Sequence, residues 1–164
     1  MILKLLQTIT IMLYVLVAGV LWGTWLSLGQ TMTQYDARTF LADGQHMIAN
    51  LAGIMPVLMI SAAVGTILII LLLLPRPRPV VALWLSGLGL LLLAAVIAIT
   101  VGVEVPIDNK VKVWTEATLP ADWQDTRQTW SDWHTVRTFV SLAAVLSLVG
   151  SVVSLTGSRP ARRG

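Results

Sequence analysis

The fold is decided by residues 60–99, which read ISAAVGTILIILLLL-PRPRP-VVALWLSGLGLLLLAAVIAI. Two apolar runs without a charge flank a short turn in which proline alternates with arginine. A helix rises about 1.5 Å per residue, so about 20 residues cross a hydrocarbon core of about 30 Å. Proline ends a helix and holds the residue before it extended. The stretch therefore predicts two membrane-spanning helices that are antiparallel neighbours.

The composition extends this pattern to the whole chain. Of the 164 residues, 56% are hydrophobic and only 12% are charged, whereas soluble domains are about 45–50% apolar. Backbone in lipid must satisfy its own hydrogen bonds, so long apolar runs become helices. We expect one all-α transmembrane domain over residues 1–164, an integral membrane four-helix bundle with a long, partly helical outer loop before the last helix. The predicted helices are about 5–28, 48–74, 80–103 and 122–155, and the outer loop is 104–135.

The charges are distributed unevenly over the predicted loops. All eight acidic residues fall in the first and third loops. The N-terminus, the second loop and the tail carry only basic residues, and cytoplasmic segments are enriched in Lys and Arg. The sequence thus predicts that both termini are cytoplasmic, in a bacterial inner (plasma) membrane. The basic residues that carry this prediction are Lys4, Arg76, Arg78, Arg159, Arg162 and Arg163.

Several classes of function are excluded or disfavoured. The chain has no cysteine, which excludes thiolate catalysis and Cys-ligated zinc or iron–sulfur sites. The net charge is +3, but no cluster of basic and stacking residues predicts a nucleic-acid site. Phosphate loops, nucleophile elbows and the HExxH motif are missing. The aliphatic helix centres argue against a transporter or channel, because transport sites need polar groups at mid-membrane.

The last predicted helix carries an unusual face. Its chemistry-bearing residues recur at steps of four and three, which places them on one side of the helix. Six of the seven tryptophans lie at or beyond the outer boundary, where an interfacial aromatic belt is the alternative interpretation. Arg137 is interpreted either as a snorkelling anchor or as a residue that faces the bundle and pairs with an anion or carboxylate. The face consists of Trp123, Arg127, Trp130, His134, Arg137 and Ser141.

Other polar residues are expected at the outer ends of the helices. Helix three is expected to break at Pro106, which leaves Glu104 at its end. Two histidines and a carboxylate are the ligand set of a non-haem iron triad and also suit zinc. His46, Glu104 and His134 are therefore candidate metal ligands, and separate interfacial residues or a hydrogen-bonded network are the alternatives. Gly19, Gly23 and Ser27 form a small-residue stripe that predicts close helix packing.

The outer segments resemble the anthrone oxygenase-like family of membrane proteins. The resemblance lies in EVPIDN at 104–109, Trp114, PADW at 120–123, Trp130 and HTVR at 134–137. It implies oxygenation of a lipid-soluble, anthrone- or quinone-like aromatic without a required cofactor. By the same resemblance Asn109, Trp130, His134 and Arg137 are the expected catalytic positions, whereas Glu104 stands where the family has asparagine.

The resemblance leads to a mechanistic hypothesis. A flat phenolic molecule enters from lipid and stacks on Trp130 or Trp133. His134 then removes a proton, and Arg137 stabilises the resulting enolate or phenolate, which reacts with oxygen. Trp123 and Asn50 complete the expected substrate contacts.

The alternative hypothesis is a non-catalytic accessory subunit of a larger membrane protein complex. Its Trp-rich outer loop would then dock a partner, because buried aromatic residues and arginine are typical of interface hot spots. Both hypotheses place the chain among membrane lipids, and neither involves nucleic acid.

Overall fold

The computed structural model describes residues 1–29, 31–77 and 79–156, and these residues form helices and connecting turns without any strand. The predicted all-α class is therefore confirmed. In chain order the helices are α1 (Ile2–Thr24), η1 (Trp25–Gly29), η2 (Met32–Gln34), α2 (Ala37–Leu51), α3 (Ile54–Leu73), α4 (Val80–Ile99), η3 (Thr100–Glu104), α5 (Val105–Val111) and α6 (Trp123–Thr156).

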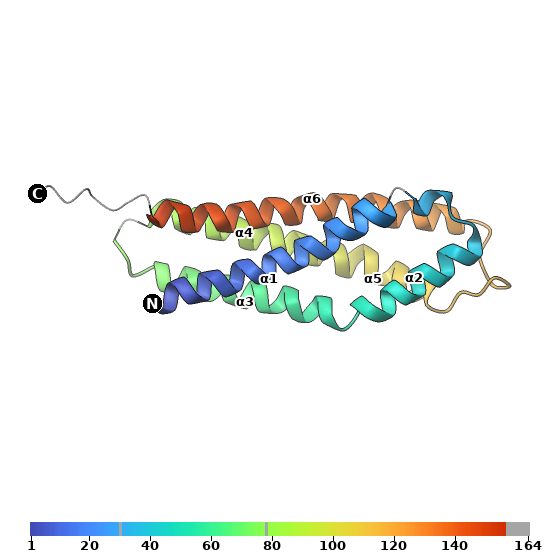
Figure 1. Ribbon diagram of the computed structural model, residues 1–164, viewed down its shortest axis with the longest axis horizontal. Coiled ribbons are helices and arrows are strands. Elements are labelled where there is room, and N and C mark those ends of the chain that lie inside the picture. The colour runs from blue at the N-terminus through green and yellow to red at the C-terminus, as the bar shows by residue number, and fades with distance from the viewer. Residues whose placement is uncertain (30, 78, 157–164) are drawn as a thin grey trace, which may run out of the picture.

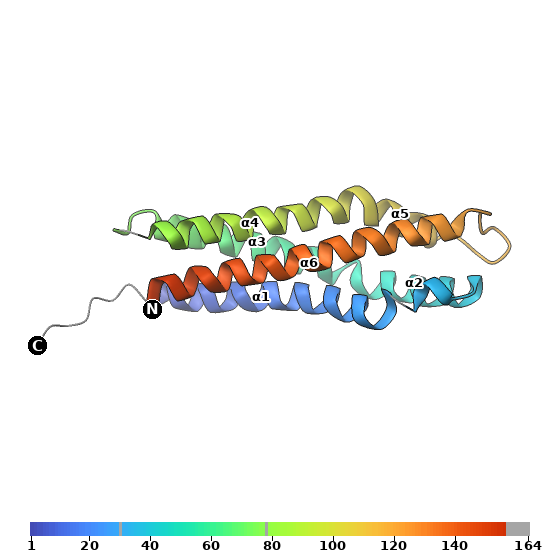
Figure 2. The ribbon, with the colours of Figure 1, turned by 90° about the horizontal axis from the view of Figure 1, so that it is seen from above.

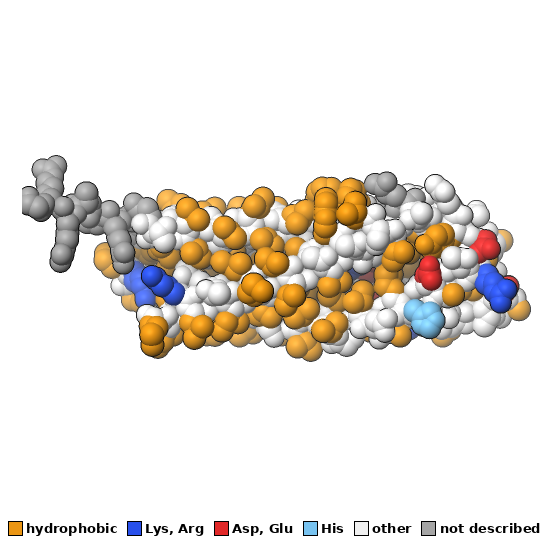
Figure 3. Space-filling view, in the orientation of Figure 1, with side chains coloured by type: hydrophobic (Ala, Val, Ile, Leu, Met, Phe, Trp, Pro, Cys, Tyr) orange, Lys and Arg blue, Asp and Glu red, His pale blue; other side chains and the backbone are white. Residues whose placement is uncertain are grey.

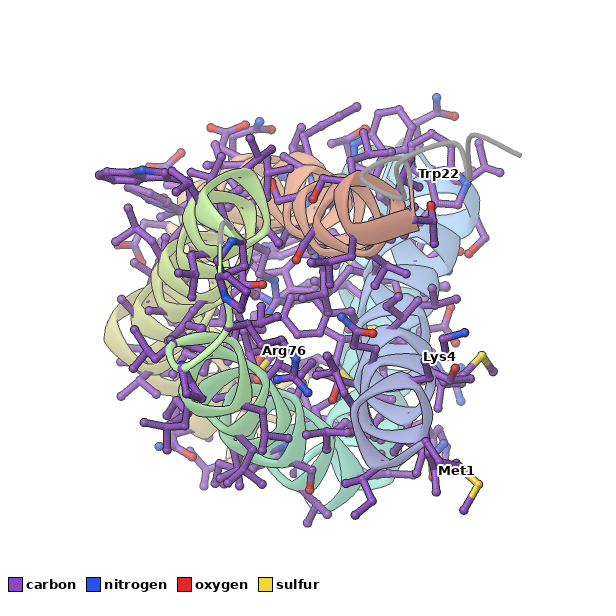
Figure 4. The ribbon with its side chains drawn as sticks, turned by 90° about the vertical axis from the view of Figure 1, so that its left-hand side faces the viewer. Met1, Lys4, Trp22 and Arg76 are labelled. Atoms are coloured by element: carbon purple, nitrogen blue, oxygen red, sulfur yellow. The ribbon has the colours of Figure 1, made fainter. Side chains whose placement is uncertain are left out.

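Four long helices form an elongated bundle. Helix α1 packs on α3 and α6, and α4 packs on the same two helices from the other side. Viewed along its length, the bundle shows these helices at the corners of a square (Figure 4). Met1 and the last turn of α6 lie at one end, the terminal end (Figures 1 and 2). Helices α2 and α5 lie at the opposite end, the loop end, where they form part of the wall of the site described below.

The long helices are suited to a membrane. The segments Ile2–Gln34, Ile54–Leu73, Val80–Val111 and Trp123–Thr156 are each long and apolar enough to cross one. Hydrophobic side chains cover the middle of the bundle, and charged side chains gather toward the two ends (Figure 3). Such a continuous apolar surface is stable in contact with lipid, whereas exposure of the same side chains to water would be unfavourable. The chain is therefore an integral membrane protein.

Helix α6 is much longer than a bilayer requires. Its 34 residues correspond to about 50 Å, against about 30 Å of hydrocarbon. It begins one residue after Asp122, the predicted N-cap, whose carbonyl accepts from the backbone N–H of Thr126 at 3.4 Å. A single continuous helix thus extends from the loop end into the membrane.

The predicted helix at 48–74 is interrupted in the structure. Helix α2 ends at Leu51 and α3 begins at Ile54, with a turn at Ala52 and Gly53 between them. Helix α2 starts at a capped end, because Asp36 Oδ1 accepts from the backbone N–H of Thr39 at 2.8 Å. That bond holds the pKa of Asp36 below its ordinary value. Much of the first loop is therefore an amphipathic helix, which the sequence analysis missed.

The expected break of helix three at Pro106 is wrong. Helix α4 passes through the π-helical turn η3 into α5, which carries the proline in its first turn. Proline has no N–H to donate, and it stands just after the π turn, where the hydrogen-bond pattern of the α-helix is already changed. A π turn also adds one residue to the helical repeat and changes which residues face inward.

Helices α1 and α3 approach closely at Gly65 of α3, where a Cβ would collide with the side chain of Thr10 on α1. The predicted contact stripe on the first helix is not found. Gly19 and Gly23 are exposed, and a Cβ on either would meet nothing within 4 Å. Close packing of α1 therefore uses its own threonine against the glycine of a neighbour.

The terminal end carries Lys4 at its rim and Arg76 near the middle of the end face (Figure 4). Both belong to the basic set that predicted a cytoplasmic location. Arg78, Arg159, Arg162 and Arg163 lie outside the described residues.

Candidate functional site

A cavity of about 280 Å³ lies in the loop-end half of the bundle, just below the range of about 300–1,000 Å³ usual for small-molecule sites. Helices α1, α2, α3, α5 and α6 all contribute to its wall. Its lining is mostly aliphatic and methionine side chains, with polar groups from α1, η3 and the loop-end parts of α5 and α6. The polar or aromatic lining residues are Thr24, Thr100, Asp108, Asn109, Lys112, Trp130, His134 and Arg137.

The predicted face of α6 points into the bundle. Trp130, His134 and Arg137 are 6%, 1% and 9% exposed, and all three line the cavity. The Trp130 and His134 rings are stacked, with centroids 4.7 Å apart and planes 6° apart. Spacings of four and three residues place these side chains one above another. This face was readable from the sequence because α6 is a regular helix through these positions.

Both ring nitrogens of His134 are engaged. Nε2 lies 3.1 Å from the carbonyl oxygen of Leu21 on α1, and a carbonyl only accepts, so Nε2 carries the hydrogen. Nδ1 is then the acceptor, and Arg137 donates to it from Nε at 3.2 Å and from Nη2 at 2.9 Å. The imidazole is therefore neutral and its lone pair is occupied by the guanidinium.

Arg137 also pairs with the end of helix α4. Its Nη2 lies 3.1 Å from Oε2 of Glu104, whose side chain is 1% exposed. Its Nη1 donates to Oγ1 of Thr100 at 3.2 Å. A buried charge is tolerated when it is paired and hydrogen-bonded. Of the two interpretations of Arg137, the structure supports the inward-facing residue that pairs with a carboxylate, not the snorkelling anchor.

Asp108 and Lys112 line the cavity as well, and the sequence analysis did not select either. They follow Glu104 at steps of four residues, a spacing that places all three on one helical face. The expected break at Pro106 hid this spacing, because the residues were then assigned to a loop. Arg137 interacts electrostatically with both Glu104 and Asp108, and the side chain of Trp130 lies beside both carboxylates.

Asn109 is exposed on α5 and lines the cavity, and its expected catalytic role stays a prediction. The other expected substrate contacts lie elsewhere. Asn50 is exposed on α2, and Trp133 is 41% exposed on the outside of α6. Trp123 packs on Phe40 at 5.2 Å between ring centroids and carries the Arg127 guanidinium 4.8 Å above its ring. Trp123 thus stabilises the loop end and does not line the cavity.

The predicted meeting of His46 with Glu104 and His134 is not seen. His46 is exposed on α2 and does not line the cavity, because α2 turns Phe40, Leu41, Gly44 and Ile48 inward instead. Among residues 1–29, 31–77 and 79–156, no group of three His, Cys, Asp or Glu side chains could hold a metal ion. Of the alternatives, a hydrogen-bonded network describes His134 and Arg137, and Glu104 joins them through an ion pair with Arg137.

Fold and site together define a four-span helical membrane protein with a buried Glu–Arg–His network beside an apolar cavity. The family model described as anthrone oxygenase matches residues 47–147, well over half of the chain. The chain belongs to this family. The match includes the cavity-lining residues of α3, α5 and α6 and excludes α1. No curated protein and no solved structure matches the chain.

Proposed function

We propose that this protein oxygenates a lipid-soluble, anthrone-type aromatic with molecular oxygen, and that Arg137 binds the oxyanion of the reacting substrate. The observation that carries the proposal is the buried Arg137 guanidinium at the wall of a cavity that is lined mainly by aliphatic and methionine side chains. Membership of the anthrone oxygenase family supports the substrate class.

The cavity suits a flat, hydrophobic molecule. Met47, Met55 and Met59 line it together with aliphatic side chains, and methionine adapts to aromatic ligands. Ala52 and Pro56, at the joint of α2 and α3, line the cavity and are also exposed. Because α1 packs on α3 and α6 while α2 packs on α5 and α3, this joint offers a lateral entrance for a molecule dissolved in lipid.

Arg137 has the donors to hold a substrate oxygen. A guanidinium carries five N–H groups, and the hydrogen bonds of Arg137 to His134 and Thr100 use three of them, while Glu104 contacts Nη2 as an ion pair. One N–H on Nη1 remains for a ligand in the cavity. A preorganised cation in a dry site stabilises developing negative charge far better than water does.

The reaction needs only the substrate and oxygen. Loss of a methylene proton converts the anthrone to its enolate, with the charge on the oxygen at Arg137. The electron-rich carbon reduces O₂ and bonds to it, which gives a hydroperoxide. Loss of water then leaves a carbonyl group, so the substrate gains one oxygen atom and the second oxygen leaves as water. No cofactor is required in this scheme.

We assign His134 to positioning Arg137, not to the proton removal suggested by the resemblance. Its Nδ1 lone pair accepts two N–H groups of Arg137, so it is not available as a base. Trp130 supplies a stacking wall beside His134. Asn109 is assigned to a second polar atom of the substrate, since it lines the same cavity.

The experiment uses membranes from cells that produce the protein, with anthrone as the probe. Oxygen consumption and anthraquinone absorbance should both exceed those of membranes without the protein. Arg137→Lys should reduce this activity at least about 100-fold, because the compact lysine ammonium cannot replace the planar set of guanidinium N–H donors. Equal rates in membranes with and without the protein would refute the proposal.

The accessory-subunit hypothesis is less well supported by the structure. Trp130 is buried, and Trp114 and Trp123 are half-buried within the loop end. Among the tryptophans of the predicted outer loop, this leaves Trp133, which is 41% exposed. We further propose that the loop end faces the periplasm and both termini face the cytoplasm, as the charge asymmetry indicates.

A further inference from the structure

The cavity holds a carboxylate to which the family resemblance assigned no role. Asp108 is the one carboxylate among the described residues that line it. Glu104 is 1% exposed and paired with Arg137, and it does not line the cavity. His134 has both nitrogens occupied. Of the acidic and imidazole groups near the cavity, Asp108 is therefore the one placed to receive a proton from a bound molecule.

The position of Asp108 relative to Arg137 fits this role. Asp108 lies one helical turn beyond Glu104 on the same face, and Arg137 interacts electrostatically with both carboxylates. The acceptor of the proton and the site of the oxyanion are thus neighbours on the cavity wall. General-base catalysis needs a base within reach of the reacting C–H bond while the charge develops elsewhere.

We propose that Asp108 is the catalytic base of the oxygenation, an inference that rests on the proposed function. The C–H bond of the substrate methylene breaks, its proton goes to Asp108, and its electron pair becomes the enolate at Arg137. The enolate carbon bonds to O₂, and the peroxide anion takes the proton back from Asp108.

Asp108 acts a second time when the hydroperoxide decomposes. The carboxylate removes the remaining hydrogen on the oxygenated carbon as a proton, and that C–H electron pair forms the new carbonyl bond. The O–O bond breaks and its electron pair leaves as hydroxide. Hydroxide takes the proton from Asp108 and departs as water, which restores the carboxylate. Atoms and electrons balance with O₂ as the oxidant.

The test separates proton removal from oxidation. Without oxygen, the base should still exchange the methylene hydrogens of anthrone with D₂O, which mass spectrometry detects. Asp108→Asn should slow this exchange by at least about 100-fold, the usual contribution of a general base. Asp108→Glu, which keeps a carboxylate, should retain part of it. The matched control is Asp132→Asn, since Asp132 is an exposed carboxylate on α6 that accepts from Gln128.

Binding is measured in parallel by quenching of tryptophan fluorescence with anthraquinone. The affinity of Asp108→Asn for anthraquinone should lie within about 3-fold of that of the unmodified protein. This result would exclude a folding defect as the cause of slow exchange. Unchanged exchange in Asp108→Asn, with oxidation intact in the unmodified protein, would overturn the role of Asp108 and leave the proposed function standing. Neither exchange nor oxidation in the unmodified protein would refute both. Loss of exchange in Asp108→Glu and Asp108→Asn together with lost anthraquinone binding would assign Asp108 a structural role instead.

Discussion

Arg137 donates to Nδ1 of His134 through two of its nitrogens, at 3.2 and 2.9 Å, from a position three residues further along the same helix. On the other side of the ring, Nε2 is bound to the carbonyl oxygen of Leu21 on α1. The imidazole thus connects α1 to the guanidinium and sets its orientation.

His134→Asn should keep more activity than His134→Ala. The asparagine oxygen can accept from Arg137 near the position of Nδ1, whereas alanine leaves the guanidinium without that partner. A hydrogen bond to a charged group contributes about 1.5–3 kcal/mol, so anthrone oxidation should fall about 10- to 100-fold in His134→Ala. Rates in membranes with equal protein content measure the difference. If asparagine is as inactive as alanine, the imidazole has a chemical role that we have not assigned.

Glu104→Gln should destabilise the protein strongly. The substitution leaves the Arg137 charge buried without its carboxylate partner, and breaking a buried pair in this way costs about 3–5 kcal/mol. Titration with SDS in mixed micelles measures the free energy of unfolding.

The matched control is Glu116→Gln. Glu116 pairs with Arg38 at 3.6 Å, but the two side chains are 66% and 83% exposed. An exposed pair contributes at most about 1 kcal/mol. Equal effects of the two substitutions would show that the Glu104 pair is also solvated.

Gly65→Ala should destabilise the contact between α1 and α3. Its Cβ would collide with Oγ1 of Thr10, which is held by a 2.8 Å hydrogen bond to the carbonyl of Leu6, and would lie 3.1 Å from Cγ2. Overpacking of this kind costs about 1–3 kcal/mol. Thermal unfolding in detergent should show a lower midpoint, and Thr10→Ala in the same chain should restore it. Gly87→Ala is the control, since Gly87 is exposed with nothing within 4 Å, and alanine should leave stability unchanged or raise it.

Single cysteines should report the orientation of the chain. The protein has no cysteine of its own, so each introduced thiol is the only target for a maleimide. Glu116→Cys at the loop end should react with a membrane-impermeant maleimide on intact cells. Arg76→Cys at the terminal end should react only after the cells are opened. Labelling of Arg76→Cys on intact cells would reverse the proposed topology.

Much of the fold was predictable from local sequence. The four apolar runs, the turn between α3 and α4 and the inward face of α6 all follow from hydropathy and from a helical repeat of 3.6 residues. Gly53 and Pro56 indicate a kink in the outer half of the second predicted helix, but neither the full break at Ala52 and Gly53 nor the passage through Pro106 was predicted. Both depend on how turns at helix ends redistribute backbone hydrogen bonds, which residue type alone does not determine.

The candidate site divides in the same way. Trp130, His134 and Arg137 were predictable because they lie on a regular helix, and Asn109 was expected from the resemblance. Asn50 and His46 were placed wrongly, since the rotation of α2 depends on its packing against α5 and not on the hydropathy of 48–74. Asp108 was missed because a loop was expected after Glu104. The chain continues there as a helix, so the spacing of four residues places Asp108 on the same helical face as Glu104.

The sequence by itself determined that the chain enters lipid as helices and which side of α6 is turned inward. These properties are local, because the transfer of apolar side chains from water to lipid adds up residue by residue. Only the tertiary structure decided that Glu104 pairs with Arg137, that His134 is held by Leu21, and that Asp108 lines the cavity. Such contacts depend on the rotation and register of separate helices, which are set when the helices pack against one another.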